Sequence, residues 1–261
     1  MIYKFCAKTD TGRSRDNNED SVAVDEDTRL AVLADGMGGY NAGEIASGMA
    51  TAFIKSEMSR WLTEVGGTAR AKDVRRAMEI CVDSANLSIF NAANSNSNYS
   101  GMGTTLVVGV FRDDLLVLGH IGDSRCYRWR AGKLEQISRD HSLLQEQIDA
   151  GLVTPEQAQH SNIKNLVTRA LGVEEIVLLE VNEYPVELGD LYLMCSDGLS
   201  DMVQDAAIAK ILSAEGGLEQ KVQMLVDAAN DSGGRDNISV LMVEVLEATE
   251  KRSLIARLLG K

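Results

Sequence analysis

The amino-acid sequence predicts an α+β fold that is built mainly from antiparallel strands. Two observations lead to this prediction. Apolar, strand-forming stretches come in runs that short turns join, as is typical of hairpins. The two long helical patterns follow one another directly and do not alternate with strands, which disfavours a βαβ repeat. Two β-sheets stacked face to face, with helix pairs on the outside, would use all of these elements.

The first third of the chain predicts a short strand and two helices. Leu30–Ala34 is apolar, rich in strand formers and ended by Asp35-Gly36. Apolar residues then recur at roughly helical spacing in two stretches, namely Ile45, Met49, Ala52, Phe53 and Trp61, and then Val74, Met78, Cys81, Ala85 and Ile89. The polar tract Asn94–Ser100 predicts a loop after the helices.

The rest of the chain predicts mainly strands. Two hairpins, a buried strand, a helix and a final strand are expected in this order: Thr104–Phe111 with Leu115–Ile121, Arg125–Trp129 with Lys133–Ile137, Leu191–Cys195, Leu218–Ala229 and Ile238–Val245. Between the second hairpin and the buried strand, residues 141–170 lack any strand pattern and contain two short helical candidates, around Gln145 and Gln157.

Composition limits the class of protein. The 261 residues fit one large domain or two small ones, and 44% hydrophobic residues suffice for a sizeable core. The formal charge of −13 argues against nucleic acid as a main partner, because no broad basic surface would neutralise its phosphates. An anionic substrate would therefore have to be met locally, by a few cationic side chains or by a bound metal.

The cellular location is predicted from the absence of a signal peptide and of a membrane-spanning segment in the sequence. The first residues have no long apolar core of a signal peptide, and no run approaches the ~18 apolar residues of a membrane span. The four cysteines are far apart and form no CxxC pair, which disfavours a disulfide framework or a zinc site. We therefore expect a soluble, cytoplasmic protein without a transmembrane segment.

Several aspartates share one local context. Asp35, Asp123 and Asp197 each follow an apolar strand candidate and lie next to glycine, while Asp236 precedes the last strand and Asp20 closes an acidic pair. Asp-Gly is also a favoured turn dipeptide, so each of them alone has a purely structural interpretation. Converging carboxylates repel one another unless a cation lies between them, and Mg²⁺ or Mn²⁺ suits a site made only of carboxylates. The pattern leaves both interpretations open.

Arg15 indicates which anion such a site would meet. It lies five residues before Asp20, and a guanidinium can hold phosphate oxygens in a bidentate fork. A surface arginine that pairs with nearby acidic residues is the alternative. With a metal site beside it and no histidine nucleophile, Arg15 favours phosphoryl transfer to water.

Six short segments, in this order along the chain, are typical of one known family. They are Arg15-x-x-Asn18-Glu19-Asp20, Ala34-Asp35-Gly36-Met37-Gly38-Gly39, Gly103-Thr104-Thr105, Gly122-Asp123-Ser124-Arg125, Ser196-Asp197-Gly198-Leu199-x-Asp201 and Gly234-Arg235-Asp236-Asn237. Together, across residues 9–240, they resemble the compact bacterial form of the type 2C metal-dependent (PPM) serine/threonine protein phosphatases. The resemblance implies a four-layer fold, with two antiparallel sheets between two pairs of helices.

The resemblance also implies a two-metal centre. Asp35 would bridge two Mn²⁺ or Mg²⁺ ions, with the carbonyl oxygen of Gly36 as a further ligand. Asp197 and Asp236 would hold one of the two ions. Arg15 would bind the phosphate of the substrate, phosphoserine or phosphothreonine in a protein.

Other residues have supporting roles in this family. Asp20 and Glu19 would support the centre, in part through water. Asp123 and Asp201 match positions that hold a third, weaker metal in bacterial members. Asn237 would orient its neighbour or the adjacent carboxylates.

The chemistry implied is hydrolysis by metal-activated water. Two cations lower the pKa of a water between them, and the resulting hydroxide attacks phosphorus in line. Eukaryotic members carry a histidine directly after the Asp-Gly pair, proposed to protonate the leaving oxygen, and here that position is Met37, so the acid is not assigned. Ser124 and Ser196 are interpreted as local hydrogen bonders and not as nucleophiles. His141 is interpreted in the same way, and His120 as part of the core or of a sheet face.

The resemblance implies one catalytic domain over residues 1–247, with a flap at about 141–170 beside the active site. The short basic amphipathic tail, 248–261, is expected to dock on the domain as a terminal helix. Expected partners are phosphorylated proteins and a cognate Ser/Thr kinase, and the protein is expected to be a monomer. Two alternatives remain: a catalytically silent member that acts as a binding module, and a phosphatase for small phosphoesters.

Overall fold

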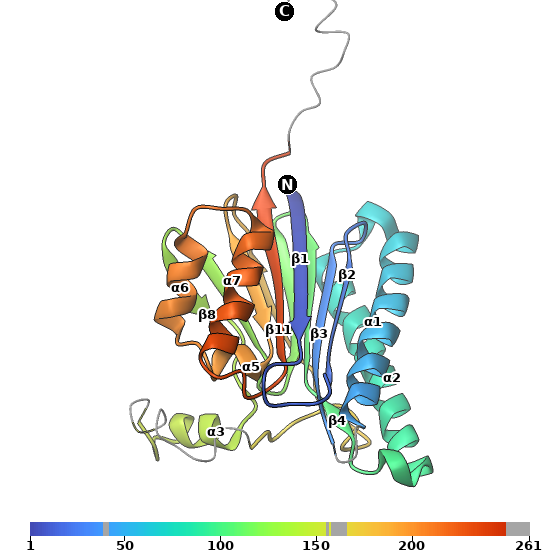
Figure 1. Cartoon of the computed structure of the whole chain (residues 1–261). Coiled ribbons are helices and arrows are strands. Elements are labelled where there is room, and N and C mark those ends of the chain that lie inside the picture. The colour runs from blue at the N-terminus through green and yellow to red at the C-terminus, as the bar shows by residue number, and fades with distance from the viewer. Residues whose placement is uncertain (39–41, 155–156, 158–165, 249–261) are drawn as a thin grey trace, which may run out of the picture.

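Two antiparallel β-sheets lie face to face at the centre of the structure, a computed structural model that describes residues 1–38, 42–154, 157 and 166–248 (Figure 1). The five-stranded sheet has the order β1-β11-β10-β7-β8. The six-stranded sheet has the order β2-β3-β5-β6-β9, with the short β4 paired to β3. The predicted α+β sandwich is confirmed.

The strands of each sheet come from both halves of the sequence. The five-stranded sheet consists of β1 (Ile2–Asp10), β7 (Arg125–Arg130), β8 (Lys133–Gln136), β10 (Leu191–Cys195) and β11 (Ile238–Leu246). The six-stranded sheet consists of β2 (Asp20–Asp25), β3 (Leu30–Met37), β4 (Gly103–Thr104), β5 (Leu106–Arg112), β6 (Leu115–Ile121) and β9 (Glu180–Pro185). Phe111 joins the sheets, because its ring centroid lies 5.2 Å from that of Tyr3 and 5.3 Å from that of Tyr192.

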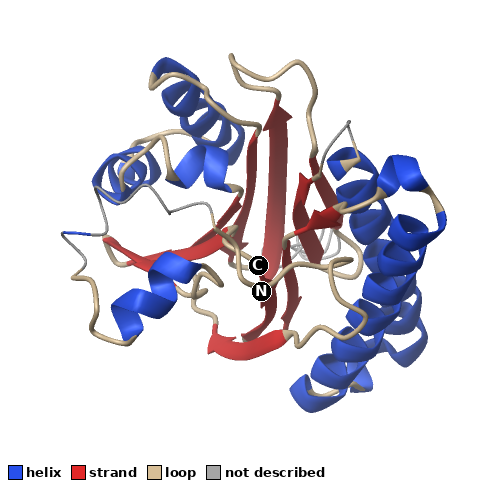
Figure 2. Cartoon of the chain, turned by 90° about the horizontal axis from the view of Figure 1, so that it is seen from below, coloured by secondary structure: helices blue, strands red, loops and turns tan. Residues whose placement is uncertain are grey.

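A pair of helices covers the outer face of each sheet (Figure 2). The six-stranded sheet packs against α1 (Gly43–Val65) and α2 (Ala71–Ser95), and the five-stranded sheet against α6 (Asp205–Ser213) and α7 (Leu218–Asp231). The remaining described helices are short: η1 (Gly66–Thr68), η2 (Ser97–Tyr99), α3 (Leu143–Asp149) and α5 (Asp197–Ser200). None of the described helices combines the length and the apolar composition needed to cross a membrane.

The first predicted helix is confirmed as α1, but the residues whose spacing predicted it are not its fully buried residues. Ala52 is exposed and Ile45, Met49, Phe53 and Trp61 are only partly buried, whereas the fully buried stripe contains Ala46, Ser47, Ala50, Thr51 and Ile54. Small residues let the helix pack closely on β2 and β3, and a pattern of large apolar residues does not mark them. Thr51 also contributes a polar contact, since its Oγ1 lies 2.7 Å from the Oγ of Ser21. The predicted face of α2 is confirmed, with Val74, Met78, Cys81, Ala85 and Ile89 all buried.

The sequence did not predict the strands β1, β2 and β9, the helix α6 or the short helices η1, η2 and α5. The helical candidate around Gln145 is confirmed as α3. The candidate around Gln157 falls mostly outside the described residues, and the expected tail helix does so from residue 249 onward.

Strand ends from both sheets meet at one end of the sandwich, the lower end in Figure 1. The strands β3, β6 and β10 end there, and β2 and β11 begin there, because neighbouring strands in the sheets are antiparallel. The five aspartates singled out in the sequence lie at these ends: Asp20, Asp35, Asp123, Asp197 and Asp236.

Candidate metal centre

Asp20 and Asp35 face each other directly in the β2–β3 pair. Like charges in this arrangement destabilise a sheet. Asp20 is buried, and its Oδ2 accepts a 2.8 Å hydrogen bond from the Oγ of Ser196, which follows β10 in the other sheet. The second oxygen, Oδ1, is also buried and has no hydrogen-bond partner in the described part of the chain. A buried carboxylate oxygen of this kind is costly unless a cation or a proton meets it.

Burial and mutual repulsion raise the pKa values of the clustered aspartates. Burial raises the pKa of Asp35 well above its usual range, and the carboxylates of Asp20, Asp197, Asp123 and Asp236 raise it further, in that order. Burial also raises the pKa of Asp197, followed by the charges of Asp123 and Asp236. These shifts show that the carboxylates from five strand ends share one electrostatic environment.

Asp20 and Asp123 titrate near neutral pH. Burial raises the pKa of Asp20 to about 6, against the hydrogen bond from Ser196, which lowers it. Burial raises the pKa of Asp123 to about 6, with further contributions from Asp140 and Asp201. Asp201 therefore lies near the cluster, at the end of α5.

The cluster fits oxygen-coordinated divalent cations. Its side chains are carboxylates, Asp20 is buried while the other four are partly exposed, and the buried Oδ1 of Asp20 has no partner among the described residues. Within the described ranges, no three acidic, histidine or cysteine side chains form a complete ligand group as they stand. Carboxylates that repel one another are expected to stand apart until cations draw them together.

The backbone around Asp35 is held by two threonines of the Gly103-Thr104-Thr105 segment. The Asp35 N–H donates to Thr105 Oγ1 at 3.0 Å, and the Asp35 carbonyl oxygen accepts from Thr104 Oγ1 at 2.8 Å and from the Thr105 N–H at 2.9 Å. Sequence analysis recognised this segment but gave its residues no role. The bonds fix the direction in which Asp35 leaves β3. Met37, two residues on, lies opposite Gly103 in the β3–β4 pair.

Gly36 occupies a place where no side chain fits. A Cβ atom at Gly36 would lie 2.2 Å from the carbonyl oxygen of Gly43 and 2.5 Å from that of Glu19. The Gly36 N–H donates to the Glu19 carbonyl at 3.1 Å. Burial raises the pKa of the Glu19 carboxyl, while Arg15 and a hydrogen bond from the Gly43 N–H lower it. Gly36 thus brings Asp35, Glu19 and the start of α1 together.

Arg15 lies at the rim of the cluster. Its Nη2 is 2.7 Å from Oδ2 of Asp236, and about half of its side chain, 51%, is exposed. The hydrogen bond with Asp236 raises the pKa of the guanidinium. The structure therefore shows the acidic pairing that the sequence offered as an alternative, and it places this pair at the candidate site.

Asn237 ties the segment that carries Arg15 and Glu19 to the start of β11. Its Oδ1 accepts from the Glu19 N–H at 2.8 Å, and its Nδ2 donates to the carbonyl oxygens of Thr11 at 3.0 Å and Asn17 at 2.8 Å. The Asn237 N–H donates to Asp236 Oδ1 at 2.8 Å. The last contact joins Asn237 to its neighbour Asp236, and the others reach the 11–19 segment, which sequence analysis did not foresee.

Asn237→Ala is expected to lower the free energy of unfolding by about 2 kcal/mol or more, because it leaves buried backbone groups without partners. Urea denaturation measures the change. Asn98→Ala, at an exposed asparagine, is the matched control and should stay within about 0.5 kcal/mol of wild type. Equal effects of the two substitutions would contradict this account of Asn237.

Metal-free protein is expected to lose stability between pH 4 and pH 7 through Asp20. Its pKa is about 6 in the folded state, against ~3.9 for an unfolded chain. Between these values the folded state binds more protons, so the free energy of unfolding falls as the pH rises. Asp20→Asn removes this titration. When its free energy of unfolding is subtracted from that of the wild type, the contributions of the other titrating groups cancel.

The difference in unfolding free energy between wild type and Asp20→Asn should change by roughly 2 kcal/mol over this range. Urea denaturation with excess chelator at pH 4, 5, 6 and 7 measures it. A difference that does not vary with pH would show that Asp20 is not desolvated as described.

The serines and histidines also lie where local hydrogen bonding is expected. Ser196 bonds Asp20 as described, and the Oγ of Ser124 lies 2.7 Å from that of Thr105. His120 is buried, with Nε2 2.8 Å from the carbonyl oxygen of Ser124. His141 Nδ1 accepts from the Gly122 N–H at 3.2 Å.

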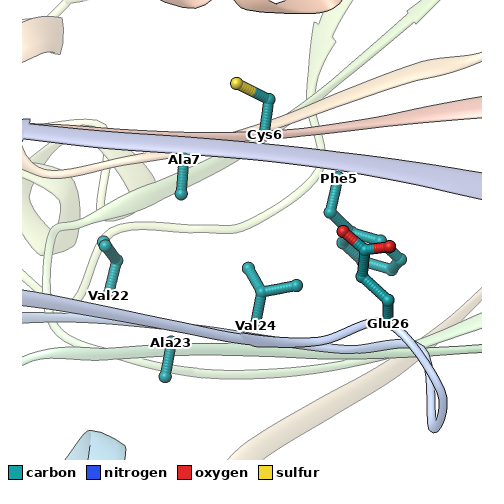
Figure 3. A pocket seen from close by; sticks show the side chains of 7 residues that line it. All are labelled: Phe5, Cys6, Ala7, Val22, Ala23, Val24 and Glu26. Atoms are coloured by element: carbon teal, nitrogen blue, oxygen red, sulfur yellow. The ribbon is translucent and has the colours of Figure 1, made fainter.

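A hollow of about 280 Å³ lies between β1 and β2, away from the aspartates (Figure 3). Phe5 and Ala7 of one strand and Val22 and Val24 of the other line it. Glu26 is its one charged lining residue among those described, so the hollow offers no group of carboxylates for a cation.

Comparison with known proteins identifies the family of this chain. Residues 10–239 match the protein phosphatase 2C family. The serine/threonine phosphatase stp of Listeria innocua is 35% identical over 240 residues, which make up 91% of this chain and 94% of that protein.

Solved structures of similar proteins share the fold. The serine/threonine phosphatase PstP/Ppp of Mycobacterium tuberculosis has a TM-score of 0.87 and 36% identity, and the match covers 95% of this chain and 100% of the other. The catalytic domain of a phosphatase PstP, solved in complex with two manganese ions, has a TM-score of 0.82 and 34% identity, with 94% and 99% covered. The resemblance inferred from the six segments is confirmed: this chain belongs to the protein phosphatase 2C family.

Proposed function

We propose that the protein is a metal-dependent phosphatase that hydrolyses phosphoserine and phosphothreonine in proteins and so reverses a Ser/Thr kinase. One observation carries the proposal: aspartates from separate strand ends lie close enough to raise the pKa values of Asp35 and Asp197, and Arg15 lies at their rim. The relatives named above are serine/threonine phosphatases, and one of them was solved with two manganese ions.

The two-metal centre is proposed to use the residues that the six segments indicate. Asp35, with the carbonyl oxygen of Gly36, would hold two Mn²⁺ or Mg²⁺ ions, and Asp197 and Asp236 would bind one of them. For Asp35 and Asp197 this assignment is supported by desolvation and by the charges of neighbouring carboxylates, which raise the pKa of each. For Asp236 it is supported by its charge, which contributes to both shifts.

The neighbouring residues are proposed to support the centre. Asp20 and Glu19 would do so in part through water, and the unpartnered Oδ1 of Asp20 supports its share. Asp123 and Asp201 would hold a third, weaker ion, since the charge of Asp201 raises the pKa of Asp123. Asn237 would keep Asp236 and the 11–19 segment in register.

The protein's own side chains bind the phosphate and orient the carboxylates. The bound cations supply the positive charge that activates water and neutralises phosphate oxygens. Arg15 is half exposed, so its guanidinium can leave Asp236 for the oxygens of an incoming phosphate. Thr104, Thr105 and Ser196 hold Asp35 and Asp20 through buried hydrogen bonds, so little reorganisation is needed during the reaction.

Hydrolysis of a phosphothreonine peptide tests the proposal directly. Turnover should require Mn²⁺ or Mg²⁺ and should stop with excess chelator. The same protein is given phosphorylated metabolites of matched charge in parallel. Preference for the metabolites would assign a small phosphoester as substrate, and no turnover by folded, Mn²⁺-loaded protein would favour a binding module.

The proposal extends to cell biology and organisation. We place the enzyme in cytoplasmic signal transduction, as a monomer with a cognate kinase and with one catalytic domain over 1–247. In the described part of the expected flap, the Leu143 N–H donates to Leu166 and the Thr168 N–H to His141, so its two stems pair. Light scattering after size exclusion should give a mass near 28.3 kDa for the monomer.

A further inference from the structure

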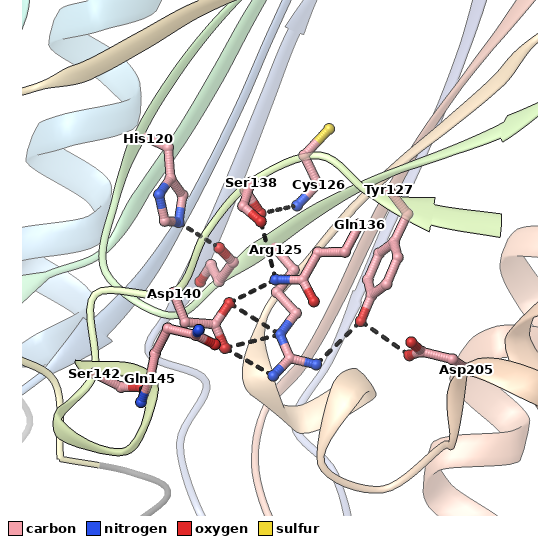
Figure 4. Close-up of polar contacts among 11 residues, drawn as sticks. His120, Arg125, Cys126, Tyr127, Gln136, Ser138, Asp140, Ser142, Gln145 and Asp205 are labelled. Atoms are coloured by element: carbon pink, nitrogen blue, oxygen red, sulfur yellow. Dashed lines mark hydrogen bonds and ion pairs between the residues drawn. The ribbon is translucent and has the colours of Figure 1, made fainter. Parts of the chain in front are cut away.

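A buried ion pair lies between the turn that carries Asp123 and the start of segment 141–170. Arg125 Nε lies 3.1 and 3.0 Å from the two oxygens of Asp140, and Nη2 lies 2.7 Å from Oδ2. The side chain of Asp140 is 9% exposed and that of Arg125 is 25% exposed. Gln136 Nε2 donates to Asp140 Oδ1 at 2.8 Å, so the carboxylate is held from two sides (Figure 4).

The remaining guanidinium nitrogen extends the contact to α6. Arg125 Nη1 donates to the hydroxyl of Tyr127 at 3.1 Å, and this hydroxyl donates to Asp205 at 3.2 Å. Asp205 is the first residue of α6. Figure 4 shows the guanidinium between Asp140 on one side and Tyr127 on the other. The position of Arg125 is therefore fixed by its strand, by β8 and by a helix.

Asp140 is followed directly by the residue that holds the Asp123 turn. The His141 N–H donates to the carbonyl oxygen of Gly122 at 2.7 Å, and the Gly122 N–H donates to His141 Nδ1 at 3.2 Å. Gly122 has a positive φ of 103° and immediately precedes Asp123. On its other side, His141 accepts from the Thr168 N–H at 2.8 Å, which joins the two stems of the expected flap. A shift of Asp140 would move both the turn and the stems.

We propose that Asp140, through its ion pair with Arg125, is a positioning residue that holds the Asp123 turn and the stems of segment 141–170 as one unit. The proposal rests on the proposed function where it concerns metal binding. Without the Asp140 charge, the guanidinium would be left near Asp123 with no carboxylate of its own. It would then compete with a cation for the Asp123 carboxylate.

A second ion pair on the same strand provides a matched control. Arg130 Nε and Nη2 lie 2.7 and 2.6 Å from the two oxygens of Asp190, whose side chain is 1% exposed. Arg125 and Arg130 are the first and last residues of β7, so the two pairs lie at opposite ends of one strand. Asp140→Asn and Asp190→Asn therefore each remove one charge from a bidentate arginine pair, of which only the first adjoins Asp123. Arg130 keeps a second carboxylate in Asp190→Asn, since its Nη1 lies 2.6 Å from Oε1 of Glu187.

The experiment compares the wild type with Asp140→Asn and Asp190→Asn in two measurements. Hydrogen exchange of single amides is followed by NMR, and Mn²⁺ binding by calorimetry. In Asp140→Asn we expect faster exchange at His141, Gly122 and Thr168 and at least about tenfold weaker Mn²⁺ binding at the weakest site. In Asp190→Asn the exchange rates at these three amides and the affinity for Mn²⁺ should both match the wild type. Arg125→Lys and Arg130→Lys repeat the comparison should either asparagine variant fail to fold.

The outcomes separate this proposal from the proposed function. If Asp140→Asn and Asp190→Asn give the same exchange at His141 and Gly122, the ion pair is merely structural and the positioning role is overturned. If Asp123→Asn loses the weakest Mn²⁺ site while Asp140→Asn keeps it, the coupling to the metal is overturned. If the wild type neither binds Mn²⁺ nor hydrolyses phosphopeptide, the proposed function fails, and the exchange data still decide the positioning role.

Discussion

Asp35→Asn is expected to lower phosphopeptide hydrolysis by about 10²–10³-fold, the several kcal/mol that metal ions contribute to stabilising such a transition state. The same substitution is expected to raise the thermal midpoint of the metal-free protein. Burial and four neighbouring carboxylates disfavour the charged form of Asp35, and asparagine removes that charge at almost unchanged shape. A metal-binding carboxylate that its neighbours repel should show these opposite effects, because it is needed for activity but destabilises the protein when no metal is bound.

Calorimetric scans with and without Mn²⁺, beside phosphothreonine turnover, measure both effects. Wild type should gain about 2.7 kcal/mol at an ion concentration of 100 times Kd, and Asp35→Asn should gain little. Asp83→Asn, at an exposed aspartate of α2, is the control and should behave as wild type. Turnover indifferent to chelator and to Asp35→Asn would show that the metal centre is assigned to the wrong residues.

Gly36→Ala is expected to destabilise the protein by about 3 kcal/mol or more and to abolish Mn²⁺-induced stabilisation. The added methyl group would lie 2.2 Å from one carbonyl oxygen and 2.5 Å from another, and neither belongs to a flexible side chain. Backbone must therefore move, and the nearest backbone carries Glu19 and the first residue of α1. Urea denaturation, with and without Mn²⁺, measures both losses.

Gly48→Ala is the matched control because it makes the same chemical change in the interior of α1. No atom lies within 4 Å of a Cβ built at Gly48. Helix interiors favour alanine, so this variant should be more stable than wild type by about 0.5–1 kcal/mol. Two glycine-to-alanine substitutions twelve residues apart should thus change the free energy of unfolding in opposite directions. Destabilisation by Gly48→Ala, or a neutral Gly36→Ala, would contradict the described packing.

The positions of Asp35, Asp123 and Asp197 could be predicted from sequence because each follows a stretch that is recognisable as a strand. Asp35 and Asp197 follow apolar runs, and the turn residues after them are unambiguous. These strand ends meet in space because neighbouring strands are antiparallel and the two sheets are stacked face to face. The contacts of Asn237 with Thr11 and Asn17 could not be predicted, since they join residues more than 200 positions apart through backbone groups that any sequence would offer.

Elements with weak hydrophobic signals were missed for different reasons. In β1, Tyr3 and Phe5 are buried and Lys4 is exposed, so an alternating signal was present but short. The strand β9 is mostly polar and is stabilised by its register with β6 on one side only. The buried stripe of α1 consists largely of alanine, serine and threonine, which pack because they are small. Asp140 was not singled out, because it lies between β8 and α3 and its partner, Arg125, lies on β7.

The position of β11 in its sheet has a consequence for how the protein folds during synthesis. This strand pairs with β1 through a nine-residue register and separates β1 from β10, so the last strand of the fold fills the middle of its sheet. Such distant pairing is slow to form, and on the ribosome it must wait until residues 238–246 have emerged. Asp236 and Asn237 arrive with that strand. The proposed metal centre can therefore assemble only after residues 238–246 have left the ribosome, and a chain that is released before this point would lack the place of Asp236 in the sheet.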